Sequence, residues 1–216
     1  MKILPLIALA VVTIPLTACD VDLGVRGNGH VVTVQQQIGS FSEISARGSL
    51  RIEWNSGAPS LSITTDENLI EYFEARTTGN RLELRMRDRV RPSHGVKIAI
   101  TSPSLNGAKL SGATDLMAHG LTGPSFAMQT SGASTVVLDG TVDRLLADMT
   151  GASELKAKTL QVKVAEISTT GAADAWVNAS EKLRVAITGA GDVTYSGNPP
   201  IIERRVTGAG TIRHKD

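Results

Sequence analysis

Residues 111–140 read SGATDLMAHGLTGPSFAMQTSGASTVVLDG. This stretch contains two copies of one motif, in which a glycine lies between a small hydroxyl residue and an alanine. The tripeptide occurs six times, at Ser111-Gly112-Ala113, Ser131-Gly132-Ala133, Thr150-Gly151-Ala152, Thr170-Gly171-Ala172, Thr188-Gly189-Ala190 and Thr207-Gly208-Ala209. Successive glycines are 20, 19, 20, 18 and 19 residues apart. This period is typical of a solenoid, because so short a repeat cannot bury its own apolar face and must stack on its neighbours.

Short alternating runs follow each tripeptide, and a second run completes most repeats. The first runs are residues 115–118, 135–138, 154–157, 174–177, 192–195 and 211–213, and the second runs are residues 126–129, 145–148, 160–164 and 183–187. Alternating apolar and polar residues between turn-forming residues predict strands. We therefore expect an all-β fold, a right-handed parallel β-helix-like solenoid with coils of about 19 residues that stack about 4.8 Å apart.

Each part of the tripeptide has a structural role in such a stack. The glycine permits a backbone angle at the corner of each coil that other residues avoid. The Ser or Thr before it is expected to form a ladder of hydroxyls along the stack, and the alanine after it is expected to fit a tight interior. The motif therefore predicts a corner of the fold.

Residues 30–105 keep strand character but lose the period. Strands are predicted at residues 30–34, 49–54, 61–64 and 96–100, with one helical turn at residues 66–73 capped by Asp66. In residues 81–91 every odd position is charged and the even positions include Leu, Leu, Met and Val, which predicts a half-buried strand. We interpret this half as less regular coils that close one end of the same stack, and a separate small β domain is the alternative. The charged residues 213–216 are expected to cap the other end.

The N-terminal segment has the order of a bacterial secretion signal: Lys2, an apolar run at residues 3–15, and Leu16-Thr17-Ala18-Cys19. The last four residues resemble a lipobox, the motif at which bacterial lipoproteins are cut and whose cysteine receives diacylglycerol. We expect residues 1–18 to be a signal peptide, lipidated Cys19 to anchor the chain durably to a membrane, residues 19–29 to form a tether, and residues 30–216 to form a single β-solenoid domain.

Two alternatives to the lipid anchor stay open. A transmembrane helix needs roughly 20 apolar residues, more than this run supplies. A plain secretory signal would be cut after Ala18 and leave Cys19 unmodified; Cys19 is the only cysteine, so it has no disulfide partner within the chain. Asp20 resembles the residue that retains enterobacterial lipoproteins in the inner membrane. It favours the periplasmic side of the inner membrane over that of the outer membrane.

The charge balance gives no support for a nucleic-acid partner. Removal of Lys2 with the signal leaves 21 basic against 21 acidic residues in a chain of 198 residues, so there is no basic excess to neutralise phosphates. Aromatic residues make up 3% of the chain. A thin stacked interior filled by Val, Ile, Leu and Ala accounts for that scarcity.

The repeats resemble a known family when they are taken together with two C-terminal segments, Gly191-Asp192-Val193-Thr194-Tyr195-Ser196-Gly197-Asn198-Pro199 and Thr207-Gly208-Ala209-Gly210-Thr211-Ile212. They are similar, over residues 38–213, to the auto-transporter adhesin head domain, also called the GIN domain. The resemblance implies a β-helix-like bacterial envelope domain, often on lipoproteins, whose family name records a suspected adhesive role. It implies no catalytic, cofactor-binding or metal-binding residues, because none is defined for the family.

An acidic column is the main candidate for chemistry in the repeats. Stacking places the residues two after each alanine in one column, and four of the six are acidic: Asp115, Glu154, Asp174 and Asp192. Clustered carboxylates suit calcium or a cationic ligand, and paired carboxylates in a β-helix are also compatible with a polysaccharide hydrolase or lyase. A solvated, solubilising edge is the simplest interpretation.

Other residue types give weaker signals. The four histidines, His30, His94, His119 and His214, have no spacing that places two on one metal. Ser153 and Lys156 match a Ser-x-x-Lys motif whose companion motifs are missing. The glycines at 24, 27 and 29 precede a strand, whereas those of a dinucleotide loop follow one. Trp54 and Trp176 are able to stack on sugars, and packing is the alternative.

We expect a non-catalytic, lipid-anchored envelope module that binds a glycan, peptidoglycan or an envelope protein and needs no cofactor. A carbohydrate-active hydrolase or lyase is the alternative from another class, and a structural envelope accessory without a ligand is a third.

Overall fold

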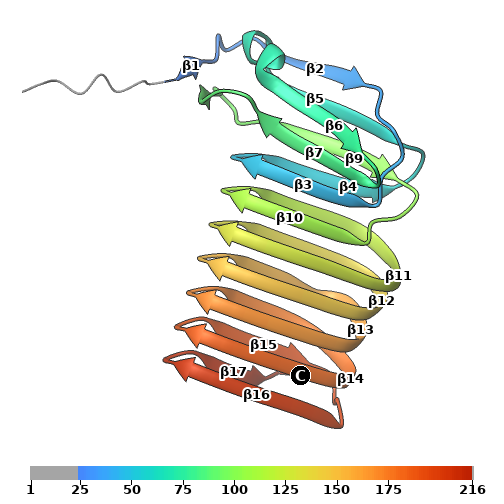
Figure 1. Cartoon of the computed structure of the whole chain (residues 1–216), viewed down its shortest axis with the longest axis vertical. Helices are drawn as coiled ribbons and strands as arrows, with labels where there is room; N and C mark the ends of the chain where they lie inside the picture. The colour runs from blue at the N-terminus through green and yellow to red at the C-terminus, as the bar shows by residue number, and fades with distance from the viewer. Residues whose placement is uncertain (1–23, 216) are drawn as a thin grey trace, which may run out of the picture.

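The computed structural model describes residues 24–215, which form a β-solenoid of about five turns (Figure 1). Strands account for 72% of the chain and helix for 3%. The all-β prediction and the parallel solenoid are therefore confirmed. The signal peptide, Cys19 and Asp20 lie outside the described residues.

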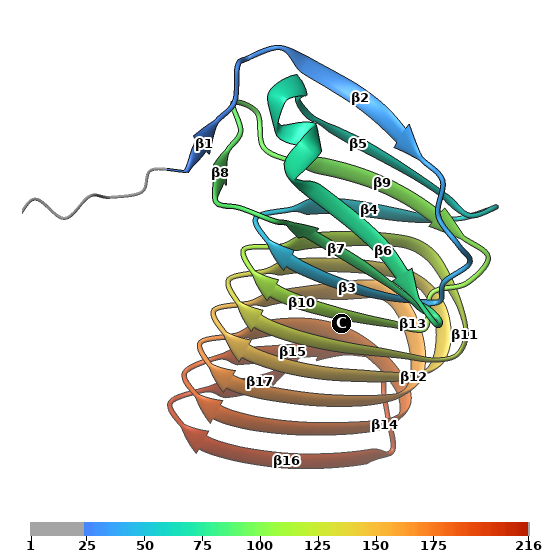
Figure 2. The same ribbon diagram turned by 45° about the horizontal axis from the view of Figure 1, so that its top comes forward.

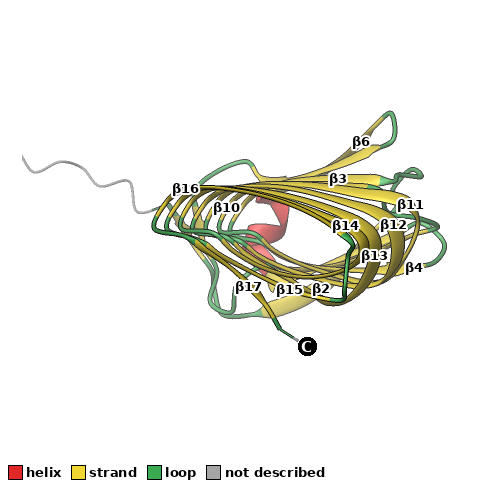
Figure 3. Cartoon of the chain, turned by 90° about the horizontal axis from the view of Figure 1, so that it is seen from below, coloured by secondary structure: helices red, strands yellow, loops and turns green. Residues whose placement is uncertain are grey.

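The regular half of the solenoid begins at residue 107. Its strands are β10 (Gly107–Gly112), β11 (Asp115–Gly132), β12 (Thr135–Gly151), β13 (Glu154–Gly171), β14 (Asp174–Gly189), β15 (Asp192–Ser196), β16 (Ile201–Gly208) and β17 (Thr211–His214). All of these neighbours pair in parallel. Each of β11 to β14 turns in its middle, so the flattened outline has two long walls (Figure 3). We call the wall of segments that end in the glycine tripeptide the front wall, and the wall of segments that follow it the back wall.

The tripeptide glycines lie at one corner of every coil, as predicted. All six have positive φ, from 92° at Gly112 to 131° at Gly189, and the strand register aligns them in one column. Gly48 opens the same column with φ 121°. The preceding hydroxyl residues also align, mostly exposed, on the outside. Close backbone stacking thus fixes glycine at the corner.

The prediction for the alanine was wrong. All six alanines of the tripeptides are exposed, and the residue after each one turns inward. That inward column consists of Thr114, Ser134, Ser153, Ala173, Gly191 and Gly210, whose side chains become smaller along the stack. The alternation of the strand continues through the corner, because Leu110, Thr114 and Leu116 are all buried at even positions, and this alternation points the alanine at 113 outward.

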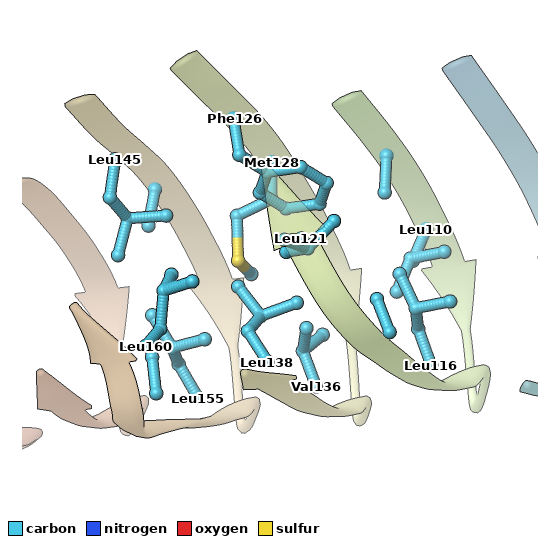
Figure 4. Close-up of a cluster of buried hydrophobic side chains, with 14 of the residues drawn as sticks. Leu110, Leu116, Leu121, Phe126, Met128, Val136, Leu138, Leu145, Leu155 and Leu160 are labelled. Atoms are coloured by element: carbon cyan, nitrogen blue, oxygen red, sulfur yellow. The ribbon is translucent and has the colours of Figure 1, made fainter. Parts of the chain in front are cut away.

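The interior is a single apolar core between the two walls (Figure 4). Leucine, valine, isoleucine and alanine fill it, and Phe126 is one of the few rings inside. Leu145, Leu155 and Leu160 are 0% exposed, so each adds about 1.5–3 kcal/mol of burial free energy. The scarcity of aromatic residues follows from the thinness of this core.

The N-terminal half joins the same sheet but departs from coil order. Its elements are β1 (Val25–Arg26), β2 (Val31–Gln36), β3 (Glu43–Gly48), β4 (Arg51–Ser56), β5 (Ser60–Asp66), the 3-10 helix η1 (Glu67–Tyr72), β6 (Phe73–Thr78), β7 (Arg81–Met86), β8 (Val90–Arg91) and β9 (Lys97–Ser102). The β3–β4 coil lies between the β7–β9 coil and the β10–β11 coil, which come later in the chain. Strands β2, β5 and β6 add antiparallel pairs, so this half is less regular, as predicted.

Helix η1 covers the N-terminal end of the core (Figure 2). Leu69 is fully buried, and Ile70 and Phe73 pack against the core. Asp66 precedes the helix but makes no side-chain cap, which corrects the predicted capping role. Its buried carboxylate instead accepts hydrogen bonds from Gly29 N at 2.7 Å and from Ser93 N and Oγ at 2.8 and 2.6 Å.

Residues 24–29 are bound to the domain, whereas we expected them to belong to a tether. Val25 N donates to Arg89 O, and Gly27 N donates to Arg91 O, both at 2.9 Å. Strand β1 pairs in parallel with β8, and Gly29 is held by Asp66. The ordered domain therefore begins at least six residues earlier than the sequence indicated.

Of the described charged C-terminal residues, Arg213 and His214 belong to β17, which covers the edge of β15, so the expected cap extends over the back wall alone. Lys215 N donates to Tyr195 O at 2.9 Å, and Arg213 lies 3.8 Å from Asp192. The tail therefore lies beside β15 on the back wall. In the part of the chain that the structure describes, all eight residues of the terminal strand β16 are exposed.

Candidate functional site

The acidic column lies on the outer side of the back wall, in the predicted register. Its aspartates bind the backbone of the next coil. Asp115 accepts from Thr135 N at 3.1 Å, and Asp174 accepts from Asp192 N at 2.8 Å. Glu154 instead pairs with Lys156 at 2.9 Å.

Asp192 makes the fullest set of these contacts. Its Oδ1 accepts from Thr211 N and Oγ1 at 3.0 and 2.6 Å. The hydroxyl of Thr211 holds the pKa of Asp192 below its usual range. Within residues 24–215 no group of three or more His, Cys, Asp and Glu side chains is placed to hold a metal ion. The geometry supports a structural role for the column, joining coil to coil.

The two tryptophans have different environments. Trp54 is buried and donates from Nε1 to Ser102 Oγ at 2.9 Å, so it is a packing residue. Trp176 is 36% exposed on the back wall, and Lys215 Nζ lies 5.3 Å from its ring centroid. The hollow beside Trp176 measures only about 10 Å³, room for one water molecule and not for a sugar ring.

The bend opposite the glycine corner is where the coils differ in length. The register shifts between Ala118 and Leu121 of β11, between Val137 and Gly140 of β12, and twice in β13 after Ala157. These irregularities absorb the variation in glycine spacing, since the front-wall segments stay in register up to each corner. The bend is therefore the variable side of the fold.

A groove runs along this bend across β11 to β14. It consists of two adjoining hollows of about 520 and 330 Å³ that share Asp143 and Lys163. We call it the bend groove, and its lining is Pro124, Ser125, Thr141, Val142, Asp143, Arg144, Leu146, Gln161, Val162, Lys163, Val164, Asn178, Ser180 and Glu181. It is larger than the front-wall hollow of about 270 Å³ around Gly107.

The bend groove combines balanced charges with neutral polar groups and an apolar patch. Lys163 Nζ lies 2.7 Å from Asp143 Oδ1, and this hydrogen bond raises the pKa of Lys163 above its usual value. Arg144 and Glu181 add one charge of each sign. Leu146 is 36% exposed on the groove wall. Such a surface suits a long, largely uncharged ligand more than a highly charged one.

Sequence analysis missed the bend groove. Four of its residues, Pro124, Asp143, Lys163 and Glu181, each lie eight residues before a corner glycine, but they differ in type and therefore form no repeated motif. The one local signal is the run Gly120-Leu121-Thr122-Gly123-Pro124, whose glycines and proline interrupt the alternation in the first of these coils.

The remaining candidate residues lie apart and have local partners. His119 Nδ1 contacts Asp139 Oδ2 at 2.6 Å, His30 contacts Glu67 at 3.0 Å, and His94 contacts Ser93 at 2.9 Å. His214 lies on the back wall at 2.9 Å from Gly197 O. Ser153 points inward and donates to Gly132 O at 3.4 Å, whereas Lys156 is exposed. Ser153 and Lys156 therefore do not form a nucleophile and base pair.

A family model described as "Putative auto-transporter adhesin, head GIN domain" matches residues 40–199. The chain belongs to the GIN domain family. This agrees with the resemblance inferred from the repeats. The matched span contains the whole bend groove and five of the six tripeptides, and it ends before β16.

Solved structures similar to this GIN domain chain share its fold. A putative adhesin of Bacteroides fragilis is 24% identical with a TM-score of 0.73, over 88% of this chain and 100% of that one. A putative adhesin of Parabacteroides distasonis is 18% identical with a TM-score of 0.58, over 88% and 99%. A protein named as a putative lipid binding protein, from the same species, is 23% identical with a TM-score of 0.52, over 89% and 99%.

Two further findings concern curated relatives and membrane spans of this GIN domain chain. No curated protein matches it. Among residues 24–215, none of the helices has the length and apolarity needed to cross a membrane.

Proposed function

We propose that this GIN domain protein is a non-catalytic adhesion module of the bacterial cell envelope and that the bend groove binds an extended glycan. The observation that carries the proposal is the groove itself, which crosses four coils and is larger than the front-wall hollow around Gly107. A groove that runs along the stack fits a polymer better than a compact metabolite. The family name, which refers to adhesins, supports the same class of function.

The chemistry of the groove favours a glycan over a polyanion or an apolar peptide. Leu146 and Val164 offer an apolar surface to the C–H face of a sugar ring. Gln161, Asn178 and Ser180 supply amide and hydroxyl groups that hydrogen-bond to sugar hydroxyls. Because the acidic and basic side chains balance, the groove has no net charge with which to attract a polyanion or a polycation. Neutral or N-acetylated glycans, including the glycan strands of peptidoglycan, are the expected ligands.

Attachment to the envelope is part of the proposal. We propose that Cys19 carries the lipid and that the domain faces the periplasm, with Asp20 favouring the inner membrane. Two or more acyl chains hold a protein at a bilayer durably, whereas one does so only marginally. Held in this way, a weak glycan-binding domain would act at high local concentration.

Binding to glycan arrays and sedimentation with peptidoglycan test this function. The Cys19→Ser chain should bind a neutral glycan, and the double variant Arg144→Ala/Leu146→Ser should bind it at least about tenfold more weakly, a loss of about 1.4 kcal/mol. Asp148→Ala is the matched control, because Asp148 is exposed on the same strand but lies outside the groove. Blank arrays, or equal loss of binding in the control, would overturn the proposal.

A further inference from the structure

Strand β16 is an open edge at the C-terminal end of the solenoid (Figure 1). It pairs with β14 on one side, and within residues 24–215 no strand pairs with its other side. Its eight residues form a straight run without proline, and Ile201, Ile202 and Val206 are 51%, 39% and 43% exposed. Natural proteins protect long exposed edges, because an unpaired edge recruits other strands.

The two ends of the stack differ in how the core is closed. Ile202 and Val206 continue the inward columns of Leu183 and Ile187, which are 0% and 1% exposed in the preceding coil. At the N-terminal end, helix η1 lies inside the outline of the coils and covers the interior (Figure 3). The C-terminal end therefore offers core positions to a partner, and the N-terminal end does not.

The charges of β16 are arranged so that the strand complements itself. Glu203 and Arg205 point outward on either side of Arg204. Glu203 already accepts from Arg184 and lies 2.7 Å from Lys182. Arg205 is exposed and makes no ion pair among the described residues. An antiparallel copy of the strand would bring a second Glu203 beside Arg205.

We propose that two copies of this chain pair through β16, antiparallel, about a two-fold axis at Arg204. Side chains directly opposite one another in a sheet point to the same face. The apolar core therefore continues across the interface only in registers that pair odd-numbered residues with odd-numbered ones and even-numbered residues with even-numbered ones. Centring on residue 203 or 205 opposes like charges, Glu203 to Glu203 or Arg205 to Arg205. Centring on Arg204 joins Ile202 to Val206 inside and Glu203 to Arg205 outside, each twice.

Arg204 does not oppose this register, although its two copies meet at the axis. Its Nη2 donates to Tyr195 Oη at 2.6 Å, and its guanidinium lies 5.5 Å from the Tyr195 ring centroid. The charge is therefore directed across the interior to the back wall. Because η1 covers the other end of each copy, the contact closes as a symmetric dimer and does not extend into a filament.

Sedimentation velocity of the Cys19→Ser chain over a concentration series tests the interface. The chain of 22.7 kDa should sediment as a dimer at micromolar concentrations. Arg205→Glu should raise the dissociation constant at least about tenfold, because it places acid against Glu203. Lys109→Glu, an equal charge reversal at an exposed front-wall position away from β16, should leave it unchanged. A monomer throughout the series, or an equally tight Arg205→Glu dimer, would overturn the proposal.

Disulfide trapping tests the register. In the Cys19→Ser chain, a mixture of Glu203→Cys and Arg205→Cys proteins should cross-link on oxidation, because directly opposed Cα atoms lie within disulfide reach. Each variant alone should cross-link far less, since its cysteines would be two residue pairs apart across the axis. Equal cross-linking of the single variants would rule out the Arg204-centred register. These readouts need no glycan, so they are independent of the adhesion proposal.

Discussion

The carbonyl oxygen of Gly132 occupies the space into which a side chain at Gly151 would project: a β-carbon at Gly151 would lie 2.4 Å from it. Gly151 also has φ 102°, which L-residues rarely adopt. Gly151→Ala should therefore incur both backbone strain and a clash with the neighbouring coil. We expect about 2–5 kcal/mol of destabilisation in chemical denaturation. A change below about 1 kcal/mol would contradict the corner arrangement.

A substitution at Gly48 separates the cost of backbone strain from the cost of the clash between coils. It has the same kind of backbone angle, φ 121°, but a β-carbon there would meet no atom within 4 Å. Gly48→Ala should therefore show the backbone cost alone, about 1–2 kcal/mol. If both alanine variants lose the same stability, close stacking of the glycines adds nothing to the requirement.

Removal of the Thr169 hydroxyl should increase the stability of the protein. Its Oγ1 is buried and, in the described structure, has no hydrogen-bond partner. Thr169→Val keeps the shape and removes the desolvation cost, so we expect about 1 kcal/mol of stabilisation. That corresponds to a rise in Tm of about 2–4 °C for a chain of this size.

Thr114→Val is the control for Thr169→Val. Thr114 is equally buried, but its Oγ1 donates to Gly48 O at 3.1 Å. The same substitution there should cost about 1 kcal/mol. Changes of the same sign at both sites would show that hydrogen bonding is not what distinguishes them.

Asp66 should make the N-terminal end sensitive to acid. The hydroxyl of Ser93, followed by the backbone N–H groups of Ser93 and Gly29, holds the pKa of the Asp66 carboxyl below its usual range. The stability that comes from this lowered pKa is complete above the unfolded-state pKa of about 4 and is lost as pH falls through the folded-state value.

Asp66→Asn should destabilise the protein by about 1–3 kcal/mol at pH 7, because one or more N–H groups would lose their acceptor. The difference between the two proteins should begin to shrink below about pH 4, where Asp66 is first protonated in the unfolded state. Urea denaturation at pH 7 and pH 3 measures it. A difference that is the same at both pH values would exclude the ionised carboxylate as its source.

Lipidation of Cys19 should determine whether the protein is attached to a membrane. The parent chain should incorporate labelled fatty acid and fractionate with membranes, and Cys19→Ala should do neither. Asp20→Ser tests the choice of membrane without removing the lipid. Membrane association that survives Cys19→Ala would favour a different mode of attachment.

The corner was predictable because it depends on one residue type at a fixed interval. Gly112 and its five successors recur because each backbone lies on the next. Gly48 was missed, since it is flanked by Arg47 and Ser49 and lies 64 residues before Gly112. The inward position was misplaced by one residue, although the alternation that places Leu110 inside, continued through Gly112, already indicates Thr114.

The bend groove and the open end could not be predicted from the repeats. The groove positions eight residues before the corner are occupied by Pro124, Asp143, Lys163 and Glu181, so no recurring residue type marks them. The edge of β16 is open because the C-terminal residues lie beside β15 and not beside β16. Arg213 and Lys215 are as suitable for covering the edge of β16 as that of β15, and only the three-dimensional pairing distinguishes the two.

The insertion of the β3–β4 coil between two later coils has a consequence for how the chain acquires its structure. Glu43 of β3 pairs with Arg81 and with Gly107, so this coil gains both neighbours only after more than sixty further residues are available. Coils from β11 onward gain their next neighbour as soon as about twenty further residues are available. Because distant pairings form more slowly than near ones, we expect folding to start in the C-terminal coils. The segment that leaves the ribosome first is then the last to become ordered.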